Sequence, residues 1–163
     1  YGYVRGDMSA AYPDSLGKLS IKRHLVMTRD WLLVVDDIEA GDEHIYTWLV
    51  HGDGPIVEDA AKGVSILRAG AWQQEGRDYV WRPGEVTLTV KPLGADKLLS
   101  KVEPAVVSGG GSPGRGVEQQ RGYHLGLTTE KPAKKHRFIV LLSPTRRCPT
   151  WSLRAPTSGA WRC

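Results

Sequence analysis

Residues 17–51, GKLSIKRHLVMTRDWLLVVDDIEAGDEHIYTWLVH, decide the fold because they contain three successive β-rich runs. In the first run the apolar residues Leu19, Ile21, Leu25 and Met27 share one parity, with Val26 as the exception. This period of two is typical of a half-buried strand. The second run, 31–35, is apolar on both faces, as in a central strand covered on both sides. The third, 44–51, is rich in aromatic and β-branched residues, so we predict a three-stranded meander with a turn over 39–42.

The rest of the chain continues the β pattern. Further short β-rich runs lie at 64–68, 79–82, 86–92, 122–128 and 137–143, with a turn expected at 82–84. No long window has helical periodicity with caps, so the sequence predicts an all-β fold of about eight strands, a two-sheet antiparallel β-sandwich. The glycine-rich sequence 108–114 cannot contribute to a core, and we expect a long surface loop over about 103–120.

The chain divides into a body and a tail. With 163 residues, 40% of them hydrophobic, it can form one sandwich domain, which we place at 1–144. Residues 145–163 are an irregular basic tail that lacks acidic residues and contains both cysteines, Cys148 and Cys163. The composition changes abruptly there, so two readings stay open: a non-native segment, such as one translated out of frame, or a genuine irregular tail.

The net charge of +4 is confined to that tail. Its arginines account for the whole excess of 22 basic over 18 acidic residues: Arg146, Arg147, Arg154 and Arg162. Because the body is neutral, we expect no nucleic-acid partner. The longest apolar run, 31–35, lies between Asp30 and Asp36, so we also expect no membrane span.

Arg23 is the most informative charged residue. It shares the parity of the apolar positions in the first run, so we expect its guanidinium to point at the core face. A buried guanidinium needs an acidic partner, and Asp36 or Asp37 would come close if neighbouring strands pair antiparallel. We therefore predict a structural ion pair of Arg23 with Asp36, while a role of Arg23 in anchoring an anionic ligand stays open.

Other candidate residues are aromatic or imidazole groups without a catalytic pattern. His51 ends a strand beside a glycine-rich turn, where function often lies. Trp72, Trp81 and Tyr123 could stack on sugar rings or simply pack between the sheets. The histidines are scattered singly, without metal-ligand spacing, and no nucleophile or phosphate-loop motif occurs. We therefore predict no metal, no cofactor and no complete catalytic set.

Several segments together resemble the C-terminal β-rich portion of the heparinase II/III-like polysaccharide lyases, a family that includes the oligoalginate lyases. They are 3–12 (YVRGDMSAAY), Arg23 in a strand, 33–38 (LVVDDI), 46–51 (YTWLVH) and 141–144 (LLSP). The resemblance extends over about residues 1–144.

The resemblance implies a function for a longer parent protein. Such enzymes join an α-helical toroid to β-sandwich domains and cleave uronic-acid polysaccharides, among them alginate and glycosaminoglycans, by β-elimination. The family's catalytic and zinc-binding motifs have no match here, so no catalytic residue is carried over. The resemblance therefore implies a fragment that is inactive alone, with an acidic polysaccharide as partner through the missing N-terminal part and a periplasmic or secreted location. The alternative is a non-catalytic carbohydrate-binding or interaction module of sandwich fold.

Overall fold

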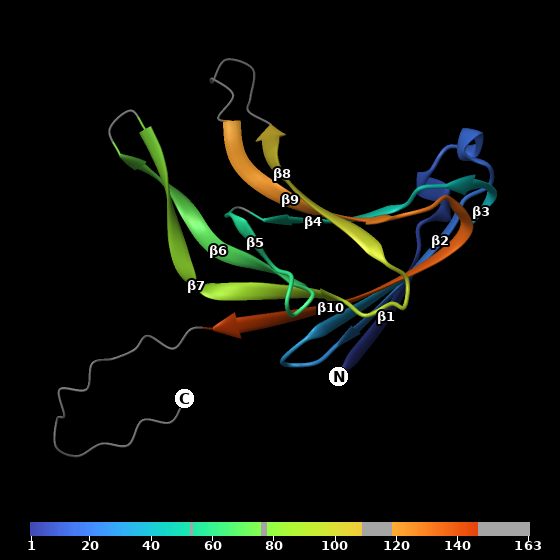
Figure 1. Ribbon diagram of the computed structural model, residues 1–163, viewed down its shortest axis with the longest axis horizontal. Coiled ribbons are helices and arrows are strands. Elements are labelled where there is room, and N and C mark those ends of the chain that lie inside the picture. The colour runs from blue at the N-terminus through green and yellow to red at the C-terminus, as the bar shows by residue number, and fades with distance from the viewer. Residues whose placement is uncertain (53, 76–77, 109–118, 147–163) are drawn as a thin grey trace.

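The computed structural model describes residues 1–52, 54–75, 78–108 and 119–146 and confirms the antiparallel β-sandwich (Figure 1). The large sheet has seven strands in the order β1-β2-β3-β10-β7-β6-β5, and the small sheet has three in the order β4-β9-β8. The strands are β1 (Gly2–Asp7), β2 (Ser20–Met27), β3 (Leu32–His44), β4 (Thr47–Gly52), β5 (Ile56–Asp59), β6 (Val64–Glu75), β7 (Asp78–Pro92), β8 (Leu98–Ser108), β9 (Gln119–Thr129) and β10 (Ala133–Arg146). Two short 3-10 turns, η1 (Ser9–Ala11) and η2 (Asp14–Leu16), connect β1 to β2.

The core lies between the small sheet and the β10–β7–β6 part of the large sheet. Its buried side chains are Tyr46, Trp48, Leu67, Val90, Leu125, Leu127, Phe138 and Val140. In β10 the core residues Phe138 and Val140 alternate with the half-buried Ile139 and Leu141, as the pleat of a strand requires. Full burial of an apolar side chain of this size stabilises the fold by about 1.5–3 kcal/mol.

The predicted three-stranded meander is wrong in its third strand, which does not pair with the second. The first two runs do pair, as β2 and β3, with Arg23 opposite Asp36. The third run is β4, which leaves the large sheet and pairs with β9 in the small sheet. Its Trp48 thereby becomes part of the core between the sheets. β3 pairs instead with β10, which begins 89 residues after β3 ends.

The turn expected over 39–42 lies inside β3, which continues to His44. The glycine there serves close packing: the Gly41 amide donates to the Gly17 carbonyl at 2.8 Å. A Cβ at Gly41 would lie only 3.0 Å from that carbonyl oxygen. Gly17 itself has a φ of 78°, a left-handed conformation that favours glycine. The glycine at position 41 therefore marks a close backbone contact rather than a turn.

The turn expected at 82–84 is also wrong, because β7 is continuous through it. Pro83 pairs with Gly70 next to a register shift between Arg68 and Gly70 in β6. Proline is tolerated in a sheet at such irregularities, where a ladder hydrogen bond is already lost.

The strands next to the predicted loop and the predicted tail are longer than expected. β8 runs to Ser108 and β9 starts at Gln119, so the ends of the predicted 103–120 loop are strand, and 109–118 lie outside the described residues. β10 continues through Thr145 and Arg146, which pair with Thr87 and Val86 of β7. The remainder of the predicted tail, 147–163, lies outside the described residues, and its origin stays an open prediction.

Candidate functional site

Arg23 and Asp36 are brought together on the core-facing side of the large sheet. The Arg23 Nε and Nη2 atoms each donate to one carboxylate oxygen of Asp36, both at 2.6 Å. The Asp36 side chain is 4% exposed, whereas that of Arg23 is 39% exposed. The expectation of a buried guanidinium is therefore corrected, because the carboxylate is the buried partner. The hydrogen bonds that Arg23 donates to the Asp36 carboxylate raise the pKa of Arg23 above its ordinary value.

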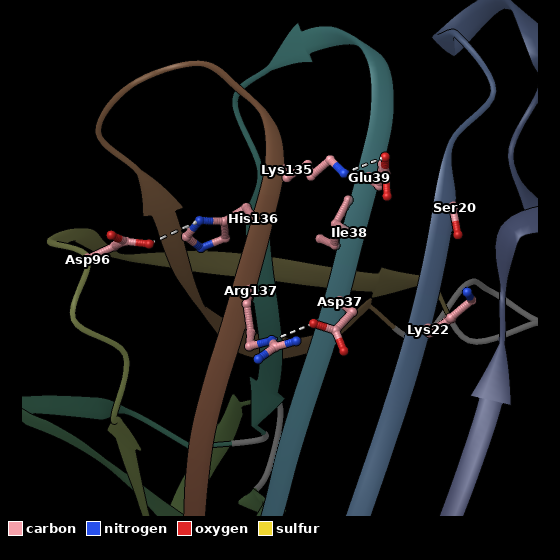
Figure 2. Close-up of a pocket in the computed structure, with 9 residues that line it drawn as sticks. All are labelled: Ser20, Lys22, Asp37, Ile38, Glu39, Asp96, Lys135, His136 and Arg137. Carbon is pink, nitrogen blue, oxygen red and sulfur yellow. Dashed lines mark hydrogen bonds and ion pairs between the residues drawn. The ribbon is translucent and has the colours of Figure 1, made fainter.

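Neighbouring positions of the same strands line an open trough of about 490 Å³, which we call the outer trough (Figure 2). Most of its charged lining residues lie on the outward parity of their strands, whereas Ile38 and His136 lie on the core-facing parity. Its lining residues are Ser20, Lys22, Asp37, Ile38, Glu39, Asp96, Lys135, His136 and Arg137. They come from β2, β3, β10 and the segment that follows β7. Charged side chains from several strands converge in this hollow.

Two cross-strand rows build the outer trough. In one row Asp37 of β3 lies opposite Lys22 of β2 and Arg137 of β10. The Arg137 Nε donates to Asp37 Oδ1 at 2.5 Å, and Asp37 Oδ2 lies 3.6 Å from the His24 Nε2. In the other row Glu39 lies opposite Ser20 and Lys135, and the Lys135 Nζ is 2.7 Å from Glu39 Oε1.

Lys22 differs from the other cations of the outer trough. Within the part of the chain that the structure describes, no carboxylate forms an ion pair with it. Hydrogen bonds from Ser9 lower the pKa of Asp7 on the neighbouring strand, and the charge of Lys22 adds a smaller contribution. The Lys22 ammonium is thus available to a ligand without the loss of an existing ion pair.

His136 is held at the core end of the outer trough, with a side chain that is 7% exposed. Its ring lies edge-on to Phe138, at 4.3 Å between ring centroids, and stacks on Tyr46 at 6.3 Å. Its Nδ1 is 3.5 Å from Asp96 Oδ2, while its Nε2 is buried and has no hydrogen-bond partner among the residues that the structure describes. Burial lowers the pKa of His136, and the nearby Asp96 opposes that effect.

The predicted ligand-contact residues do not gather in one place. His51 is exposed on the outward face of the small sheet, where its ring meets that of His124 edge-on at 5.7 Å between centroids. His124 Nε2 lies 3.3 Å from Glu103, whose pKa is lowered by hydrogen bonds from Lys101 and then His124. Tyr123 is on the opposite, core-facing parity of β9, and is half-buried.

Trp72 and Trp81 lie far along the β6–β7 hairpin and are cross-strand partners in its register. Their position in the large sheet separates them from His51 and Tyr123, which belong to the small sheet. That these four residues contact a ligand remains a prediction.

The described ranges 1–52, 54–75, 78–108 and 119–146 contain neither a candidate metal-binding group nor a helix that could span a membrane. No three His, Cys, Asp or Glu side chains there form a group that could hold a metal ion. The same residues include no helix of the length and apolarity needed to cross a membrane.

Sequence reasoning missed Lys22, Lys135 and Arg137 as site residues. Each lies on the outward parity of its strand, which looks like an ordinary solvated face when the strand is read alone. Arg137 is 100 positions from its partner Asp37. The signal that could have located them is that basic residues of β2 and β10 flank acidic residues of β3. This pattern is visible only when the β3–β10 register is known.

Comparison with known proteins finds matches among solved structures but no matching family model or curated protein. The crystal structure of heparan sulfate lyase HepC from Pedobacter heparinus matches with a TM-score of 0.51 and 20% identity over 78% of this chain. A structure of a HepC mutant from the same organism matches equally. The chain spans 18% of HepC, and at this identity the likeness is one of fold.

Proposed function

We propose that this chain is the β-sandwich portion of a polysaccharide lyase that cleaves an acidic, uronic-acid-containing polysaccharide by β-elimination, and that it is inactive by itself. The observation that carries the proposal is the likeness to HepC, because it extends over 78% of the chain with a TM-score of 0.51. The segments that resemble heparinase II/III-like lyases support the same family from the side of the sequence.

The chemistry of β-elimination supports a role as part of a larger enzyme. The reaction needs a base for the C5 proton, an acid for the leaving oxygen and a group that neutralises the uronate carboxylate. Lys22 and Arg137 of the outer trough suit the third task. His136 would suit the first two by its chemistry, but its Nε2 is buried. The base and the acid would then come from another part of the parent protein.

The substrate and the location of the parent are finer parts of the proposal. Alginate, heparin and heparan sulfate all carry uronate groups, and the resemblance to oligoalginate lyases keeps alginate among the candidates. A periplasmic or secreted location fits an enzyme that meets such polymers outside the cytoplasm. Fractionation of cells that express the parent protein, followed by immunodetection, tests that location.

Turnover assays test the proposal directly. The purified chain is incubated with alginate, heparin and heparan sulfate, and the ultraviolet absorbance of the unsaturated product is followed. We expect no product from the chain alone, and product when it is expressed together with its flanking coding sequence. An active heparan sulfate lyase serves as the positive control. Turnover by the chain alone would contradict the claim that its catalytic set is incomplete.

The second candidate is a non-catalytic carbohydrate-binding module of sandwich fold. It is favoured by the charged side chains of β2, β3 and β10 that line the outer trough, because such groups could contact a sugar without any catalytic residue. If the chain expressed together with its flanking coding sequence binds an acidic polysaccharide but forms no unsaturated product, the binding module is favoured over the lyase.

A further inference from the structure

We infer that the outer trough is a binding site for the anionic group of an acidic sugar, with Lys22 and Arg137 as the two residues that hold that group. The choice of a sugar as the carrier rests on the proposed function. The anionic group itself, a carboxylate or a sulfate ester, follows from the arrangement of the trough residues.

Arg137 is oriented for this task by Asp37. Its side chain is 63% exposed, and its Nε donates to Asp37 Oδ1. A guanidinium carries five N–H donors, of which this contact uses one. Among the described residues no other hydrogen bond of Arg137 is found, so its two terminal amino groups are free to form the fork that matches a carboxylate or sulfate. The anchored Nε lowers the conformational entropy that the side chain loses on binding.

Lys22 supplies the second positive charge from the other side of Asp37. Asp37 pairs in register with Lys22 on β2 and with Arg137 on β10. Neighbouring strands are about 4.8 Å apart, so the backbones of Lys22 and Arg137 are about 10 Å apart. Side chains of this length can reach a common anion above Asp37. Because Lys22 has no ion pair among the described residues, its contact with the ligand would replace water only.

The acidic residues of the trough do not cancel this attraction. Asp37 is held by Arg137 and faces His24, and Glu39 is held by Lys135. Asp96 faces His136 at the other end of the trough. These carboxylates also offer hydrogen-bond acceptors to sugar hydroxyl groups, so the trough presents both kinds of group that an acidic sugar requires.

An exposed aromatic pair borders the same face. Tyr3 of β1 is 57% exposed and stacks on His24 of β2 with 6.0 Å between ring centroids. Its hydroxyl is 2.7 Å from the His24 Nδ1, which fixes the orientation of both rings. His24 lies one outward position beyond Lys22 on β2. A sugar unit next to the bound anion would therefore meet an aromatic surface.

Calorimetric titration of the purified chain tests the inference with three oligosaccharides of equal length: an unsulfated uronate oligomer, a sulfated heparan oligomer and a neutral glucan oligomer. We expect binding of one or both acidic oligomers and none of the neutral one. A preference between the first two identifies carboxylate or sulfate as the group recognised. Equal binding of the neutral oligomer, or no binding of either acidic one, would overturn the inference.

Two variants locate the binding. Lys22→Gln and Arg137→Gln should each raise the Kd of the acidic oligomer about tenfold, as expected for the loss of one charge-assisted contact. Lys62→Gln is the matched control, because Lys62 is an exposed lysine with an ion pair to Asp59 near the opposite edge of the large sheet. Unchanged Kd values for both trough variants, or an equal loss in the control, would overturn the assignment. Far-UV circular dichroism and melting curves verify that each variant is folded.

This experiment is independent of the turnover assays. It measures binding by the chain alone, so loss of binding in Lys22→Gln supports the site whether or not the parent protein is a lyase. Conversely, a lyase parent whose sandwich binds no acidic oligomer would keep the proposed function and refute the outer trough as a binding site.

Discussion

At the scale of single residues, burial decides what each charged group contributes. Asp36 and Asp37 are consecutive in β3, yet they point to opposite faces and take different arginines as partners. The Asp36 side chain is buried and accepts two hydrogen bonds from Arg23, whereas Asp37 is half-exposed and belongs to the outer trough. Removal of Arg23 on the core-facing side should therefore lower the free energy of unfolding strongly, whereas removal of Arg137 on the outward side should lower it little.

Replacement of Arg23 by alanine should lower the free energy of unfolding by about 2–3 kcal/mol, because it leaves the buried Asp36 carboxylate unpaired. The value lies below that for a fully buried pair, since the Arg23 side chain is partly exposed. Arg137→Ala, which removes the exposed partner of Asp37, should cost at most about 1 kcal/mol. Urea denaturation of both variants measures the difference. If both variants lost the same free energy of unfolding, the burial of Asp36 would not explain the effect of Arg23→Ala.

His136 should make the stability of the fold depend on pH. Burial lowers its pKa in the folded state, so the unfolded chain binds the proton first as the pH falls below about 6.5. The free energy of unfolding should therefore decrease from that point until the lowered folded pKa is reached, and then stop responding to this group. In the His136→Leu variant, the decrease in the free energy of unfolding that His136 causes should be missing.

The measurement is a series of urea unfolding curves between neutral and mildly acidic pH. His51→Gln is the control, because His51 is exposed and its removal should leave the slope due to His136 in place. If His136→Leu had the same pH profile as the unchanged chain, the buried imidazole would not be the source.

At the scale of elements, β10 organises the large sheet. It pairs with β3 along one edge and with β7 along the other, so the N-terminal strands join the rest of the sheet through it. Its inward residues Phe138 and Val140 are in the core, and its outward residue Arg137 contributes to the outer trough. The same strand thus supports the sandwich with one face and the candidate site with the other.

The two faces of β10 should respond differently to truncation. Phe138→Ala removes a side chain that is 2% exposed and should cost about 3–5 kcal/mol, because the core cannot fully close around the cavity. Ile139→Ala, on the half-buried outward face, should cost less, about 1–2 kcal/mol. Chemical denaturation of both variants provides the comparison, and the opposite order would indicate that the outward face is the better packed one.

At the scale of the whole molecule, the two sheets differ in extent, and this leaves part of the large sheet uncovered. The small sheet packs on the β10–β7–β6 region, whereas β1 and β2 lie to the side of it (Figure 1). Val4 and Met27, on the core-facing parity of those strands, are 61% and 57% exposed. On the opposite margin of the sandwich a side-chain hydrogen bond between Ser100 of β8 and Glu58 of β5 joins the two sheets.

The sequence was sufficient for the strands whose patterns are local. Alternation over 19–27 and the two-faced apolar runs in β3 and β10 predicted strands that the structure contains. It failed where glycine or proline has a packing role, as at Gly41 and Pro83, because these residues look the same in a turn and at a close backbone contact. The parity of Arg23 led to the prediction of its pairing with Asp36, although the buried partner is the carboxylate rather than the guanidinium.

What the sequence by itself determined is therefore the all-β class, the faces of the strands that alternate clearly, and the charge of Arg23 on a core-facing position. Only the tertiary structure decided that β4 belongs to the small sheet and that β10 lies between β3 and β7. It also decided that Lys22, Asp37 and Arg137 lie side by side on neighbouring strands. The physical reason is that side-chain alternation is a property of each strand. Strand order and register instead depend on loop-closure entropy and on how well distant faces pack together.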